Sequence, residues 1–167
     1  MPVLKLDLPT RDYLWQVFDY DPNTGIMTRR NTGKAVGTQG EPYPRIKIRG
    51  KSYVAHRLIW RMMTDGLMPE EIDHINGVRT DNRWVNLRAA TRGENMRNFR
   101  MRSNNTSGFK GVCWHKKARS WVAQIQVNKK CMHIGCFQTP ELAHEAYWIE
   151  ALKYHGEFAN DGFGPIR

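Results

Sequence analysis

The sequence predicts an α+β fold in two modules: an N-terminal module of β-hairpins and helices, then a three-stranded antiparallel sheet packed on one C-terminal helix. Short strand-like runs separated by glycine, proline and asparagine turns predict the hairpins. Apolar residues at helical spacing predict the main helices. A small polar segment at residues 103–108, after which the composition changes, is interpreted as the linker between the two modules.

The first module is expected to start with a short helix that Thr10 caps and that reaches about Val17. The elements expected next are a hairpin of residues 18–20 and 26–28, a loop over 33–40, strands over 43–48 and 51–55 that turn at Arg49-Gly50, and a helix over 56–63. The apolar stripe expected on that helix consists of Leu58, Ile59, Met62 and Met63. Gly66 is its expected C-cap.

Two local signals organise the middle of the chain. Asn76-Gly77 is the strongest short-range sign of a two-residue hairpin, and it places His74 just before a tight reversal. The run at residues 91–94 fits a capping box, so a helix should begin there and end near residue 100. Asn95 then lies in the first turns of this helix.

The second module is expected to hold three strands, over residues 109–115, 120–127 and 130–137. Thr139 as N-cap and Pro140 after it open a helix that ends at Gly156. Its expected apolar face consists of Leu142, Ala143, Ala146, Tyr147, Ile149 and Leu152. The domain limits are therefore predicted as residues 1–102, with a motif core at about 54–100, a linker at 103–108, a second domain at 109–160 and a tail at 161–167.

The charge of the chain indicates a polyanionic partner. Lys and Arg number 26 against 16 acidic residues, which gives a net charge of +10. One cluster surrounds the central signals and consists of Arg79, Arg83, Arg88, Arg92, Arg97, Arg100 and Arg102. A generally basic protein without a nucleic-acid partner is the alternative. Three cysteines, no signal segment and no apolar run long enough for a bilayer predict a reducing, cytoplasmic setting without a membrane.

The residues around the Asn-Gly turn combine an acid, a base and carboxamides, which suits phosphodiester hydrolysis. The Asp73 carboxylate and the Asn95 carbonyl oxygen are hard ligands that suit Mg²⁺ and leave positions for water and substrate. His74 has an ordinary pKa near 6.5 and could take a proton from water. Asn86 is expected to hold the hairpin and helix together through hydrogen bonds to the backbone.

These residues carry a family resemblance. The runs Val-Ala-His-Arg-Leu-Ile-Trp, Ile-Asp-His-Ile-Asn-Gly, Asp-Asn-Arg-Trp-Val-Asn-Leu-Arg and Gly-Glu-Asn-Met-Arg-Asn, between Val54 and Asn98, closely resemble HNH endonucleases of the phage and homing type. The resemblance implies a ββα-metal fold and a catalytic set of four residues. In that set His74 is the general base, Asp73 and Asn95 are metal ligands, and Asn86 is the central asparagine. Asn98 is a neighbouring candidate ligand.

The second module resembles the ethylene-response-factor (APETALA-two) DNA-binding domain. The matching runs lie at residues 107–112, 121–125, 134–137 and in the helix from Glu141 to Tyr147. In that family one sheet face enters the major groove, so the resemblance implies DNA contacts by Lys110, Trp114, Arg119, Gln124, Gln126, Lys130 and His133. Arg57, Arg83, Arg88 and Arg97 are candidate phosphate clamps.

The sequence thus predicts a metal-dependent DNA endonuclease that uses Mg²⁺, or alternatively Mn²⁺, on double-stranded DNA, as a monomer or weak dimer. Homing and phage-type roles, and nicking or double-strand cutting, stay open. The competing classes are a non-catalytic DNA-binding regulator and an RNA-binding protein of translation. His56 is interpreted equally as a phosphate contact or as helix packing. A zinc site on Cys113, Cys131 and Cys136 is the weaker alternative to packing.

Overall fold

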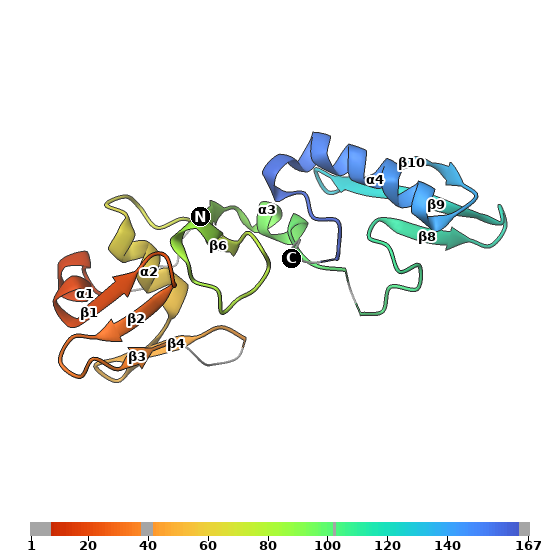
Figure 1. Ribbon diagram of the computed structural model, residues 1–167. Helices are drawn as coiled ribbons and strands as arrows, with labels where there is room; N and C mark the ends of the chain where they lie inside the picture. The colour runs from red at the N-terminus through yellow and green to blue at the C-terminus, as the bar shows by residue number, and fades with distance from the viewer. Residues whose placement is uncertain (1–7, 38–41, 102, 164–167) are drawn as a thin grey trace. The chain divides into compact units, whose positions relative to one another are not determined.

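The computed structural model describes residues 8–37, 42–101 and 103–163, and the chain divides into two compact units, Met1–Arg92 and Gly93–Arg167 (Figure 1). The predicted tail beyond residue 163 and Arg102 of the basic cluster lie outside the described residues, as does part of the predicted loop at 33–40. Within the described ranges, several small antiparallel sheets and four α-helices confirm the mixed α+β fold.

The first unit opens with α1 (Arg11–Val17), which leads directly into a hairpin of β1 (Phe18–Asp21) and β2 (Ile26–Arg29). The side chain of Thr10 accepts a hydrogen bond from the backbone N–H of Tyr13, as its N-cap role predicts. A third strand, β3 (Ala35–Val36), pairs with β2 where only a loop was predicted. Two residues are too short for a strand pattern in the sequence, and pairing with β2 defines this strand.

The next hairpin carries the chain into the central helix of the unit. Strands β4 (Arg45–Ile48) and β5 (Lys51–Val54) pair around a turn in which Arg49 and Gly50 both have positive φ. This is the conformation that favours a two-residue hairpin. Helix α2 (Ala55–Met63) follows at once.

Helix α2 ends earlier than its predicted glycine cap. Thr64 is the C-cap, and both its backbone N–H and its Oγ1 donate to the carbonyl of Trp60, so the prediction of Gly66 as C-cap is wrong. Met63 lies at the edge of the core, whereas the buried side chains of α2 belong to Ala55, His56, Leu58, Ile59 and Met62. The hydroxyl of Thr64 bonds to a carbonyl of the last helical turn, so no residue in the left-handed conformation is needed to cap the helix.

One apolar core joins the elements of the first unit. Leu14 of α1, Phe18 of β1 and Leu58 of α2 are fully buried in it. Ile72 and Leu87 extend the same core into the strand pair β6 (Glu71–His74) and β7 (Leu87–Ala90). The strand pair that carries Asp73 and His74 is therefore anchored to the N-terminal hairpins.

The Asn-Gly signal does not close a two-residue hairpin. His74 pairs with Leu87, so β6 and β7 are joined by a long loop over residues 75–86 that ends in a short 3₁₀ helix, Trp84–Asn86. Gly77 still forms a local turn, with φ of 67° and an N–H donating to the carbonyl of His74. The signal predicted the turn correctly, but the partner strand lies further along the chain.

The second unit contains α3 (Arg92–Arg97), which is shorter than the predicted helix, and then β8 (Val112–His115), β9 (Ser120–Val127) and β10 (Lys130–Phe137). The strands form an antiparallel sheet in the order β10-β9-β8, and α4 (Pro140–His155) covers one face of it (Figure 1). A single 3₁₀ turn, Gly156–Phe158, follows α4.

Helix α4 packs through a different face from the one expected. Its buried side chains are those of Ala143, Tyr147, Ala151 and His155, whereas Leu142, Ile149 and Leu152 are about half exposed. The small alanines let the helix lie close to the sheet, so larger residues on the neighbouring stripe are left at the surface. No helix in the described part of the chain has the length and apolar character to cross a membrane.

The close approach of α4 to the sheet predicts a sharp difference between two glycines. Gly108 and Gly111 both have positive φ, but a Cβ at Gly111 would lie 2.1 Å from Cδ2 of Tyr147, whereas one at Gly108 would meet nothing within 4 Å. Gly108→Ala should therefore cost about 1 to 2 kcal/mol from its backbone conformation alone. Gly111→Ala should cost about 1 to 3 kcal/mol more from overpacking. Equal losses in urea unfolding would contradict this packing.

Candidate active site

Strand β6 presents the acid and the base of the predicted site. Asp73 and His74 are each only 4% exposed, and their side chains point to opposite faces because they are consecutive in a strand. Buried polar side chains need partners, since an unmade hydrogen bond costs about 1 to 3 kcal/mol. Partners of these two residues include a side chain of the long loop and one of β7.

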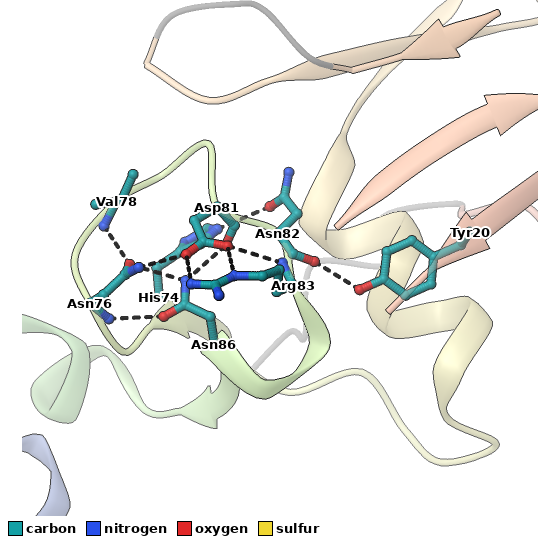
Figure 2. Close-up of polar contacts among 8 residues, drawn as sticks. All are labelled: Tyr20, His74, Asn76, Val78, Asp81, Asn82, Arg83 and Asn86. Atoms are coloured by element: carbon teal, nitrogen blue, oxygen red, sulfur yellow. Dashed lines mark hydrogen bonds and ion pairs between the residues drawn. The ribbon is translucent and has the colours of Figure 1, made fainter. Parts of the chain in front are cut away.

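The loop between β6 and β7 is clamped by Asn86. Its Oδ1 accepts from the backbone N–H of Asn76 at 3.0 Å, while its Nδ2 donates to Asn76 Oδ1 at 3.0 Å and to the carbonyl of Asp81 at 2.7 Å (Figure 2). Asn86 is 5% exposed. Asn86 thus bonds to the backbone as expected, but its partners Asn76 and Asp81 lie in the loop rather than in the helix.

Asp81 forms a second node of this loop. Asn76 Nδ2 donates to Asp81 Oδ2 at 2.7 Å, and Arg83 donates to both carboxylate oxygens from Nε and Nη2. Hydrogen bonding from Arg83 is the main cause that lowers the pKa of Asp81 to about 2. The carboxylate stays ionised at neutral pH and keeps the loop in one shape.

His74 is held by a carboxamide. Its Nε2 lies 3.0 Å from Oδ1 of Asn82, which is itself 3% exposed. Because an amide oxygen only accepts, Nε2 carries the proton and the lone pair of the neutral ring lies on Nδ1. Burial is the main cause that lowers the pKa of His74, so the ring is neutral at neutral pH. A neutral imidazole of defined tautomer has the form of a general base.

Two other rings surround His74. The ring of His56 meets it edge-on with centroids 5.0 Å apart, and Tyr43 stacks on it at 6.1 Å. His56 is 7% exposed, and its buried Nδ1 has no hydrogen-bond partner among the described residues. Burial, followed by the nearby His74, lowers the pKa of His56 from 6.5 to about 3. This placement favours the packing interpretation of His56 over the phosphate contact.

The arginines predicted as phosphate clamps have different surroundings. Arg88 donates from Nε and Nη2 to Oδ2 of Asp73 at 2.9 and 2.7 Å; the Asp73 side chain is buried, and that of Arg88 is partly buried. Arg83 is paired with Asp81. The buried Nε of Arg57 has no hydrogen-bond partner in the part of the chain that the structure describes, and burial lowers the pKa of Arg57. Arg97 belongs to α3 in the second unit.

The donor chemistry of the predicted metal ligands fits a hard divalent cation. Asp73 offers a carboxylate on β6, and Asn95 offers a carboxamide oxygen on α3. The two residues belong to different compact units. Asn98 Oδ1 accepts from Asn160 Nδ2 at 3.1 Å. Within the described residues, no group of three or more His, Cys, Asp or Glu side chains lies together as a metal site.

The sheet of the second unit brings three of the predicted DNA contacts together. Ala123 and Ile125 face α4, so the alternate residues Gln124 and Gln126 face outward, and His133 pairs beside Gln124. The other predicted contacts lie elsewhere. Trp114 and Lys130 pair with residues of β9 that face α4, so they lie on that side of the sheet. Arg119 lies in the β8–β9 turn, and Lys110 precedes β8.

Lys110 is engaged inside the unit. Its Nζ donates to the carbonyls of Arg97 and Phe99, each at 2.8 Å, and burial lowers its pKa to about 8. The neighbouring segment 103–108 is also folded, because the side chain of Asn105 accepts from the backbone N–H groups of Ser107 and Gly108. This contact network ties the end of α3 to the loop before β8.

The three cysteines lie exposed on the outward sheet face. Cys113 and Cys136 both pair with Val122 of the middle strand, from opposite sides. Cys131 contacts Gln124, and Cys136 contacts His133. Their exposure does not fit the interpretation that these thiols pack in the sheet, and the described residues hold no cluster with metal-site composition around them.

The strand pair β6–β7, the loop between them and α3 fall within a stretch that matches a known family. A family model described as HNH endonuclease matches residues 53–97, so this stretch is an HNH endonuclease domain. Protein 3.8 of Escherichia phage T7 is 32% identical over 108 residues, which are 62% of this chain and 86% of that protein. The chain belongs to the family of Protein 3.8 and carries an HNH domain. No solved structure matches it.

The resemblance of residues 109–160 to the ethylene-response-factor domain gains no support from these matches and stays a prediction. Sequence analysis also missed two residues of the site, Asn82 and Tyr20. Asn82 stood inside the quoted Asp-Asn-Arg run, but nothing in that run shows that it reaches His74. Tyr20 lies on β1, and its hydroxyl donates to the carbonyl of Asn82 at 2.8 Å (Figure 2).

The buried neutral His56 predicts a loss of stability in acid. Between about pH 6.5 and pH 3 the unfolded chain binds a proton at this residue and the folded chain does not, so stability is full above this window and falls with pH. His56→Phe should flatten the dependence of the urea midpoint on pH in that range. The exposed His133→Gln is the matched control and should keep the wild-type slope. Identical slopes for both variants would contradict the burial of a neutral His56.

Proposed function

We propose that this protein is a metal-dependent DNA endonuclease whose HNH domain hydrolyses phosphodiester bonds. The observation that carries the proposal is the hydrogen bond from His74 Nε2 to Asn82 Oδ1, beside the buried Asp73. It supports a neutral imidazole with its lone pair on Nδ1, inside a domain that matches the HNH endonuclease model.

In the proposed reaction His74 Nδ1 accepts a proton from a water molecule as the water oxygen bonds to phosphorus. The bond from phosphorus to the 3′ oxygen breaks, and the departing 3′ alkoxide takes a proton from solvent water, which leaves a 5′ phosphate and a 3′ hydroxyl. Asp73 and Asn95 would hold the divalent cation, with Mg²⁺ first and Mn²⁺ second by donor chemistry. A bound cation supplies charge stabilisation at the phosphate and at the leaving oxygen.

The ion pair between Arg88 and Asp73 bears on metal binding. Arg88 contacts Oδ2 of Asp73 through two nitrogens, so it fixes the orientation of the carboxylate. A guanidinium there also offsets the cost of burying the acid before a cation arrives. We therefore assign Arg88 to orienting Asp73 rather than to clamping a phosphate, and keep Arg57 and Arg97 as candidate clamps.

The second unit is proposed to bind double-stranded DNA through the outward face of its sheet, with Gln124, Gln126 and His133 as the contacts. Carboxamides hydrogen-bond base edges in the major groove. The net charge of +10 supports a polyanion as partner. We keep residues 1–102 and 109–160 as the proposed functional domains, with a phage or homing role for the whole.

The nuclease proposal predicts cleavage of plasmid DNA with Mg²⁺ and none with a chelator. His74→Ala should reduce cleavage by at least about 100-fold, because the general base is lost, and should leave DNA binding unchanged. The exposed His115→Ala is the matched control and should cut normally. Intact plasmid across a range of divalent metals and target sequences, together with normal binding, would favour the non-catalytic regulator.

A separate prediction concerns the sheet face. The triple change of Gln124, Gln126 and His133 to Ala should weaken DNA binding and broaden the set of cleavage sites. The cleavage rate at a saturating DNA concentration should be unchanged. Leu152→Ala, an exposed change on α4, serves as control. Gel-shift titration and mapping of cut ends measure the two effects. Unchanged affinity and site choice in the triple variant would remove the targeting role from this face.

A further inference from the structure

The hairpin β1–β2 meets the loop of the active site at two consecutive peptides, Asn82–Arg83 and Arg83–Trp84. The hydroxyl of Tyr20 donates to the carbonyl of Asn82 at 2.8 Å, and Tyr20 is 7% exposed. In the turn between β1 and β2, the carbonyl of Pro22 accepts a hydrogen bond from the N–H of Trp84 at 3.0 Å. Two hydrogen bonds thus join the hairpin to this short stretch of loop, and Figure 2 shows the one from Tyr20.

A third contact requires a glycine. A Cβ at Gly25 would lie 2.5 Å from the backbone nitrogen of Arg83 and 2.6 Å from the carbonyl carbon of Asn82. Backbone atoms cannot move aside as a flexible side chain can, so only glycine permits this approach. The turn that presents Gly25 is itself fixed by Asp21, whose carbonyl accepts from the N–H of Gly25 at 2.8 Å.

The Asn82–Arg83 peptide, which Tyr20 and Gly25 contact, follows directly from the residue whose carboxamide holds His74. Asn82 Oδ1 lies 3.0 Å from His74 Nε2. A side chain with two rotatable bonds can be placed no better than its own backbone, so support of the Asn82 peptide is support of the histidine. Tyr20 and Gly25 lie outside residues 53–97, the stretch that matches the HNH endonuclease model.

We propose that the β1–β2 hairpin is a positioning element of the active site: Tyr20 and Gly25 hold the Asn82 peptide so that its carboxamide keeps His74 in the Nε2-protonated tautomer. The catalytic meaning of this tautomer rests on the proposed nuclease function. The positioning of His74 by the hairpin does not depend on that function, because it concerns only which ring nitrogen carries the proton and how the ring is oriented. Burial raises the pKa of Tyr20 to about 12, so its hydroxyl remains a donor at neutral pH.

The direct test is spectroscopic. In ¹⁵N-labelled full-length protein at neutral pH, long-range ¹H–¹⁵N correlations should show His74, assigned with His74→Gln, as the Nε2-protonated tautomer. Tyr20→Phe removes one hydroxyl, and Gly25→Ala adds one methyl; each should move the His74 nitrogen shifts toward a mixture of tautomers. Asn82→Leu should move them furthest, whereas Asn82→Asp keeps an acceptor and should retain the wild-type tautomer.

Matched controls separate this effect from general destabilisation. Tyr13→Phe changes a tyrosine of α1 in the same unit, and Gly33→Ala has a similar positive φ with nothing within 4 Å of the new Cβ. Both should leave the His74 shifts unchanged. If Tyr20→Phe and Gly25→Ala, shown to be folded by their amide spectra, behave as these controls do, the positioning role is wrong.

Cleavage assays divide the two proposals. If the protein cuts DNA, Tyr20→Phe should lower kcat by about fivefold, the size of one net hydrogen bond, with KM for DNA unchanged. A rise in KM with constant kcat would overturn the positioning role. If the shifts respond as expected but the wild-type protein does not cut DNA, the hairpin inference stands and the nuclease proposal fails.

Discussion

The carboxamide of Asn86 closes the loop between β6 and β7, and the geometry of the site depends on that closure. One side chain bonds the backbone of Asn76 near the start of the loop and the carbonyl of Asp81 further on. With the loop folded back, Asn82 reaches His74, and the peptide beside it reaches the N-terminal hairpin. Because these groups are buried, each lost bond would leave a polar atom unsatisfied, which favours a single conformation.

The sequence predicted those elements whose signals lie within a few residues. Thr139 with Pro140 predicted the start of α4, and Arg49-Gly50 predicted the turn of the β4–β5 hairpin, where both residues have positive φ. Features that depend on distant pairing were missed or misread. β3 is defined by pairing with β2, and α4 buries its alanine stripe because the sheet admits a close helix there. Periodicity shows that a helix has an apolar face but not which of two stripes is covered.

The same division applies to the site. The residue types at Asp73, His74 and Asn86 indicated the chemistry, since their order along the chain is typical of one family. Their partners were not predictable, because Asn82 and Tyr20 meet through the tertiary fold across 62 positions of sequence. The ion pair of Asp73 with Arg88 is a cross-strand contact of β6 and β7, and it appears only once their register is known.

The three exposed thiols of the outward sheet face have a practical consequence. Cys113 and Cys136 sit on outer strands with β9 between them, so their backbones are about 9.6 Å apart, beyond the reach of a disulfide. Cys131 lies five residues along the strand from Cys136, roughly 16 Å away. A disulfide on this face must therefore link separate molecules or join a cysteine to a small thiol. The rate at which a maleimide labels these cysteines, with and without DNA, reports directly on occupancy of this face.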